Sequence, residues 1–132
     1  MENNASVQNK VLIVEDDKFF IDLLAKHLSQ AGMVVLFANN GKDGLMLAKS
    51  ERPSVILLDV LLPETDGFEM LTQVKTDENI KNTPVILLSN LGSKENLEKS
   101  KQLGAYNFMI KATVSLDQII KEAQKAIASV KS

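Results

Sequence analysis

Short apolar runs recur along the chain, and each is followed by polar residues or a turn. Four of these runs show no polar alternation, which is typical of strands buried on both faces of a parallel sheet. A fifth run alternates between two faces, as expected nearer a sheet edge. The pattern therefore predicts five strands, at Val11–Val14, Met33–Phe37, Val55–Leu58, Val85–Leu88 and Ala105–Ile110.

The segments between these strands have helical periodicity and helix-start signals. Asp66 with Glu69, and Ser115 with Gln118, have the spacing of capping boxes. The helix expected after Ser93 has few apolar anchors and should be loosely held. The other helices are expected to begin at the acid cluster Glu15–Asp17 and at the turn Asn39–Gly41.

Five strands alternating with five helices indicate an α/β fold, a parallel sheet with helices on both faces. Of the two common doubly wound strand orders, the flavodoxin-like order 2-1-3-4-5 uses five strands. We adopt that order as the predicted fold.

Length and composition limit the number of domains and the kinds of site and partner that we expect. The chain has 132 residues, which predicts one domain, and Met1–Asn9 has the polar composition of a flexible leader. The absence of cysteine excludes a disulfide framework and a thiolate metal site, and we expect a cytoplasmic setting. A net charge of −2 argues against direct nucleic-acid binding, and the apolar runs are too short to span a membrane.

Polar side chains follow the carboxyl ends of four predicted strands. Glu15 and Asp16 follow the first strand, Asp59 the third, Ser89 the fourth and Lys111 the fifth. Ligands in such sheets bind outside the carboxyl ends of the strands, so these groups should converge.

Three carboxylates beside one ammonium leave excess negative charge, which a divalent cation would neutralise. Because the available ligands are hard oxygens, Mg²⁺ is favoured and Mn²⁺ is plausible. Magnesium sites of this kind often complete their shell with phosphate oxygens. Asp59 would then be a nucleophile toward a phosphoryl group, with Lys111 neutralising charge and the Ser89 hydroxyl donating a hydrogen bond.

The ordered motifs VLIVEDD, ILLDVLLPETDGFEML, VILLSN and GAYNFMIKA closely resemble the receiver domain of two-component response regulators. The resemblance covers nearly the whole chain and implies a receiver domain over residues 10–131. It implies that Asp59 accepts a phosphoryl group from a histidine kinase or a histidine phosphotransfer protein. By the same resemblance, the metal site comprises Glu15, Asp16, Asp59 and the backbone carbonyl of Leu61.

The resemblance also implies a switching mechanism. Ser89 is the hydroxyl that follows the phosphate, Phe108 is an aromatic switch, and Lys111 pairs with the phosphoryl oxygens. The protein is then a phosphorylation-controlled binding module rather than a turnover enzyme. Its output partner would bind the face formed by the helix after Ser93, the strand Ala105–Ile110 and the last helix. The chain would be a monomer or a phosphorylation-dependent dimer.

The chain departs from the family pattern in three respects. Ala112 follows Lys111 where family members commonly have a proline in a cis bond, which leaves the isomer of this bond open. Leu61 and Leu91 lie two residues past Asp59 and Ser89, and neither can orient a water, so we predict slow self-dephosphorylation. Phe108 has no hydroxyl, so a switch there must work by packing.

Two other function classes remain as alternatives. A turnover phosphatase with an aspartate nucleophile needs a second aspartate two residues on, where this chain has Leu61. A flavin carrier on the same fold needs a Gly/Ser/Thr-rich phosphate loop after the first strand. The cluster Glu15–Asp17 would repel phosphate there.

Overall fold

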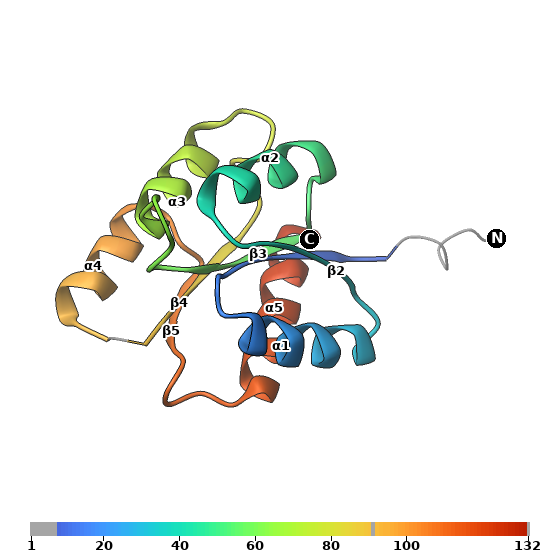
Figure 1. Ribbon diagram of the computed structural model, residues 1–132. Coiled ribbons are helices and arrows are strands. Elements are labelled where there is room, and N and C mark those ends of the chain that lie inside the picture. The colour runs from blue at the N-terminus through green and yellow to red at the C-terminus, as the bar shows by residue number, and fades with distance from the viewer. Residues whose placement is uncertain (1–7, 91, 132) are drawn as a thin grey trace.

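The computed structural model describes residues 8–90 and 92–131. These residues form five strands and five helices in strict alternation, and all strand pairs are parallel (Figure 1). The sheet order is β2-β1-β3-β4-β5, which confirms the predicted fold. The elements are β1 Lys10–Val14, α1 Lys18–Gln30, β2 Val34–Ala38, α2 Gly41–Glu51, β3 Val55–Asp59, α3 Gly67–Thr76, β4 Val85–Ser89, α4 Lys94–Gln102, β5 Asn107–Ile110 and α5 Leu116–Lys131.

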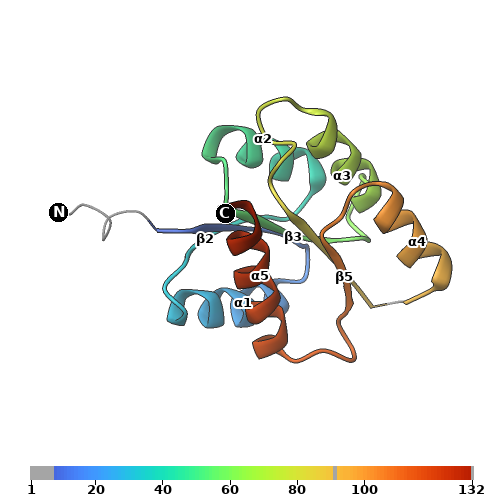
Figure 2. The same ribbon diagram turned by 180° about the vertical axis from the view of Figure 1, so that it is seen from behind.

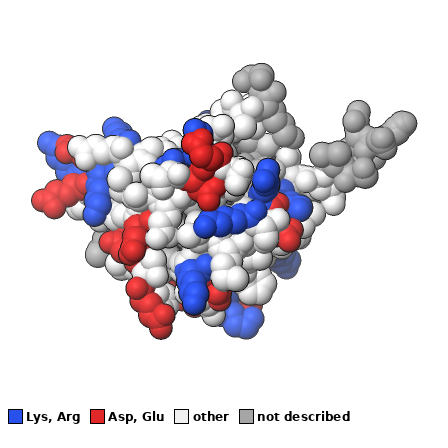
Figure 3. All heavy atoms as spheres, turned by 90° about the horizontal axis from the view of Figure 1, so that it is seen from above, with Lys and Arg blue, Asp and Glu red and all other residues white. Residues whose placement is uncertain are grey.

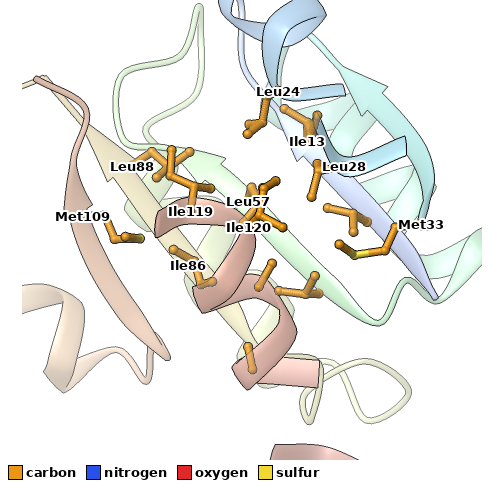
Figure 4. Close-up of a cluster of buried hydrophobic side chains, with 14 of the residues drawn as sticks. Ile13, Leu24, Leu28, Met33, Leu57, Ile86, Leu88, Met109, Ile119 and Ile120 are labelled. Carbon is orange, nitrogen blue, oxygen red and sulfur yellow. The ribbon is translucent and has the colours of Figure 1, made fainter. Parts of the chain in front are cut away.

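The helices cover both faces of the sheet. Helices α1 and α5 lie on one side, and α2 and α3 on the other, with α4 beside β5 (Figures 1 and 2). Alternate strand residues supply each core because successive side chains point to opposite faces. Figure 4 shows the first core, where strand side chains meet α1 and α5; its members include Ile13, Leu24, Leu28, Leu57, Ile86, Leu88, Ile119 and Ile120. The second core includes Leu12, Ile56, Leu58, Phe68, Leu71, Val74 and Leu87.

The predicted helix starts are largely confirmed. Ser115 and Gln118 form a reciprocal capping box, each side-chain oxygen accepting the other residue's amide. Asp66 and Ser93 cap α3 and α4. The start of the first helix differs from the expectation. Asp17 is its N-cap and accepts the amides of Phe19 and Phe20. Helix α1 therefore begins at Lys18, and the first two acids of the cluster precede it.

Two strands begin later than their apolar runs because the preceding amides close a helix. The Met33 amide donates to the Leu28 carbonyl, so β2 begins at Val34. The Ala105 amide likewise donates to the Ser100 carbonyl, and β5 begins only at Asn107.

Helix α4 is weakly anchored, as predicted. All its residues are described, and Ser100 is the only buried one. Leu97 is 39% exposed. The Lys99 ammonium lies 4.6 Å from the centre of the Phe68 ring, which adds one contact between α4 and the start of α3.

The α2–α3 side of the molecule carries both charge signs. Figure 3 views this side and shows Lys and Arg side chains interspersed with Asp and Glu. Among the described helices, none has the length and apolar content needed to cross a membrane.

Residues 1–7 of the predicted leader lie outside the described part. The Asn9 carbonyl accepts the Val34 amide. The division into leader and domain stays a prediction.

Candidate functional site

Asp59 is the last residue of β3, the central strand of the sheet. Its side chain is buried, and the neighbouring strands β1 and β4 pair with β3 on either side. The register places Leu58 opposite Val14, so Glu15 follows β1 at the level of Asp59. Carboxylate oxygens of Glu15, Asp16 and Asp59 all lie within 4.8 Å of one another. The structure therefore brings together the three acids that the strand ends predicted.

Glu15, the most buried acid of this cluster, is held by several hydrogen bonds. Its Oε2 accepts the amides of Asp16 and Asp17 at 3.1 and 3.0 Å, and its Oε1 accepts from the Lys111 ammonium. Burial raises the pKa of the Glu15 carboxyl. The bonds from Lys111 and the Asp17 amide oppose this rise in pKa, while the Asp59 charge adds to it. The position of the Glu15 side chain is thus fixed by hydrogen bonds, whereas the Asp16 side chain is exposed to solvent.

Lys111 follows β5 and reaches back across the sheet edge to the acids. Its side chain is only 11% exposed. The ammonium pairs with Glu15 and, at 3.4 Å, with Asp59 Oδ2. It also lies 4.6 Å from the centre of the Phe20 ring. The Lys111–Ala112 peptide bond is trans, like every other bond within the described residues.

Ser89 lies at the same edge as the acids. It ends β4, is buried, and pairs in register with Ile110, so it neighbours Lys111. The Lys111 amide donates to the Ser89 carbonyl at 2.8 Å. Phe108 lies within β5 instead and packs, half-buried, against the core on the α2–α3 side.

Leu61 borders the pocket. Its amide donates to Asp59 Oδ1 at 3.2 Å, and its side chain is 62% exposed. Leu91, the other residue tied to slow self-dephosphorylation, lies outside the described residues.

Gly67 is a site residue that the sequence argument missed. Its amide donates to the Val60 carbonyl at 2.8 Å. A Cβ at this position would lie 2.3 Å from the Asp59 carbonyl oxygen, closer than any side chain can approach. The available signal was the Asp66-Gly67 pair, which the sequence alone indicates only as a turn. Here the glycine lets the start of α3 pack directly on the backbone of Asp59.

The donor set fits a hard divalent cation. Three carboxylates face one ammonium, so the pocket keeps excess negative charge. All side-chain ligands are oxygens, the type that Mg²⁺ and Mn²⁺ prefer. A cation between the carboxylates would relieve their repulsion.

Comparison with known sequences gives a consistent assignment. The family model described as "Response regulator receiver domain" matches residues 11–124. Transcriptional regulatory protein CusR of Escherichia coli K12 is 37% identical over 102 residues, covering 77% of this chain and 44% of CusR. The alkaline phosphatase synthesis transcriptional regulatory protein PhoP of Bacillus subtilis is 30% identical over 105 residues, covering 80% of this chain and 43% of PhoP. The chain thus spans less than half the length of these relatives.

Solved structures match over almost their whole length. The chemotaxis response regulator CheY4 of Vibrio cholerae has a TM-score of 0.83 at 29% identity, covering 91% of this chain and 99% of CheY4. The receiver domain of the Francisella response regulator 1452 has a TM-score of 0.84 at 29% identity, with coverages of 92% and 98%. The family model matches most of the chain, and the sheet has the order expected for this fold. The chain therefore belongs to the response regulator receiver domain family.

Proposed function

We propose that this chain is a phosphorylation-controlled signalling module in which Asp59 accepts a phosphoryl group from phospho-histidine. The donor would be a histidine kinase or a histidine phosphotransfer protein. The observation that carries the proposal is the convergence of buried Asp59 with two further carboxylates and the Lys111 ammonium at one sheet edge. Membership in the receiver family supports it.

In the transfer, an Asp59 carboxylate oxygen attacks phosphorus, a P–O bond forms, and the P–N bond to the donor imidazole breaks. The imidazole leaves with its electron pair and takes up a proton. Asp16, Asp59 and the Leu61 carbonyl, together with Glu15, are the residues that would hold Mg²⁺. A bound Mg²⁺ supplies charge neutralisation at the phosphoryl oxygens.

Lys111 is arranged to change partners during this transfer. Its contact with Asp59 is long, at 3.4 Å, while Glu15 binds it closely. The ammonium can therefore keep Glu15 and pair with a phosphoryl oxygen once Asp59 is modified. The Ser89 hydroxyl would donate to another phosphoryl oxygen.

The output would be a shift between two conformations of the nearby surface. Ser89 and Phe108 are the proposed switch residues, and the weakly anchored α4 is the element most easily displaced. The proposed partner surface is the α4–β5–α5 face, where Leu97 and Tyr106 are exposed. A protein partner or a second, phosphorylated copy would bind there, with no direct contact to nucleic acid.

Intact mass spectrometry tests the chemistry. The wild-type protein is incubated with acetyl phosphate and Mg²⁺, beside a chelator control, Asp59→Asn and Asp66→Asn. Asp66→Asn is a matched control because asparagine also caps helices well and Asp66 lies outside the acid cluster.

We expect one added phosphoryl group on wild type and on Asp66→Asn. We expect none on Asp59→Asn or with chelator. Phosphorylation of Asp59→Asn, or no adduct on wild type with either acetyl phosphate or a phospho-histidine donor, would contradict the proposal.

A further inference from the structure

Phe20 contacts the proposed catalytic lysine from outside the acid cluster. The Lys111 ammonium lies over its ring, 4.6 Å from the ring centre. We propose that Phe20 is a positioning residue, which fixes the Lys111 ammonium over the pocket through its ring face. This inference rests on the proposed function, because it concerns the lysine that would meet the phosphoryl group.

The surroundings of the ammonium make the ring contact significant. Lys111 donates to Glu15 and to Asp59, and its ammonium also lies over the Phe20 ring. With the side chain only 11% exposed, water competes little for the cation. Cation–π attraction is stronger in such desolvated positions than at an open surface.

One short segment supplies two of the three groups that contact the Lys111 ammonium. Glu15 follows β1, and Phe20 lies in the first turn of α1, where Asp17 accepts its amide at 3.3 Å. The Asp17 amide in turn donates to Glu15. Phe20 also packs, half-buried, against the α1–α5 core. The ring is therefore held by a capped helix start and by the core, independently of Asp59.

This independence matters when Asp59 is modified. The contact with Asp59 is the one that the phosphoryl group would replace, whereas Glu15 and Phe20 keep their places. The lysine then meets the transferring group without first being reoriented, which is how a preorganised charge lowers a barrier.

The test compares Phe20→Leu, which keeps an apolar side chain, with Phe20→Tyr, which keeps the ring. Phe19→Leu is the matched control, because Phe19 is adjacent but 73% exposed. The phosphorylation rate is measured with acetyl phosphate and Mg²⁺, so that no protein donor contacts α1. NMR of the Lys111 side chain in the unmodified proteins reports the ring directly, through its ring-current shift.

We expect Phe20→Leu to slow phosphorylation about fivefold to tenfold. We also expect it to move the Lys111 Hε and Cε resonances toward ordinary lysine values. Phe20→Tyr and Phe19→Leu should match wild type in both measurements.

Three results would overturn the inference: unchanged Lys111 resonances in Phe20→Leu, an unchanged rate in that variant, or an equal loss of rate in Phe20→Tyr. A wild-type protein that takes up no phosphoryl group from either acetyl phosphate or a phospho-histidine donor would instead contradict the proposed function. The Lys111 resonances would still decide whether the ring holds the ammonium.

Discussion

Mg²⁺ should raise the free energy of unfolding of this protein, and Asp59 should be required for the effect. The pocket gathers three carboxylates around one ammonium, and only the folded chain holds them together. A cation that binds this arrangement but not the unfolded chain stabilises the native state by linkage.

The geometry supplies the reason for cation binding, and linkage sets the expected size of the stabilisation. Two unit charges separated by 4.8 Å, the limit of the carboxylate spacing, repel by about 3.5 kcal/mol at an effective dielectric constant of 20. At this dielectric constant shorter separations would repel more, but solvent screens the pairs that include exposed Asp16, and Lys111 offsets part of the rest. Enough repulsion remains to favour a bound cation. At a Mg²⁺ concentration ten times the dissociation constant, linkage gives about 1.4 kcal/mol of added stability.

Urea unfolding followed by far-UV circular dichroism is the suitable assay, because the chain has no tryptophan and one tyrosine. Wild type, Asp59→Asn and Asp22→Asn are unfolded in chelator and in Mg²⁺. Asp22 is a matched control, since it pairs with Lys18 on the exposed side of α1.

Wild type and Asp22→Asn should gain equally from Mg²⁺, while Asp59→Asn should gain little. In chelator, Asp59→Asn should be at least as stable as wild type, because one like charge is removed. An equal gain from Mg²⁺ in Asp59→Asn, or no gain in wild type, would refute the reasoning.

Three further predictions follow from single residues. Burial raises the Glu15 pKa above its ordinary value of 4.5, so the native state binds a proton more readily than the unfolded chain does. We compare the free energies of unfolding of wild type and Glu15→Gln in chelator. The value for wild type minus that for the variant should rise as the pH falls from neutrality toward 4.5. A decrease would show that pairing with Lys111 outweighs burial. Gly67→Ala should cost about 2 kcal/mol of unfolding free energy and slow phosphorylation, because its Cβ would displace the Asp59 backbone; urea midpoints near the wild-type value would contradict this. Leu61→Asn should shorten the half-life of the acyl phosphate, since asparagine can orient water beside the pocket, and a half-life equal to or longer than that of wild type would reject the shielding role of the leucine.

The fold and the acid cluster were predictable because they depend on simple rules. Unbroken apolar runs indicated a parallel sheet, and residues at the carboxyl ends of such strands meet at one edge. Glu15, Asp59 and Lys111 each directly follow an apolar run, and Asp16 comes one residue after Glu15. The predicted topology therefore brought these residues together.

Other features depend on tertiary contacts that no local pattern encodes. The Phe20 ring meets Lys111 only because the lysine side chain reaches back from the end of β5 to the start of α1. Gly67 is required by the approach of a distant backbone atom rather than by its own turn. The late start of β5 arises because the Ala105 amide closes α4, a hydrogen bond that hydrophobic periodicity does not show.

The central claim is that a phosphoryl group is carried on the Asp59 carboxylate as an acyl phosphate. Borohydride reduces an acyl phosphate to an alcohol and leaves free carboxylates intact, so peptide mass mapping after reduction identifies the modified residue. After treatment with acetyl phosphate and Mg²⁺, we predict homoserine at position 59 and nowhere else. Reduction at Asp16, or a phosphoryl group that survives on the Ser89 hydroxyl, would contradict the account.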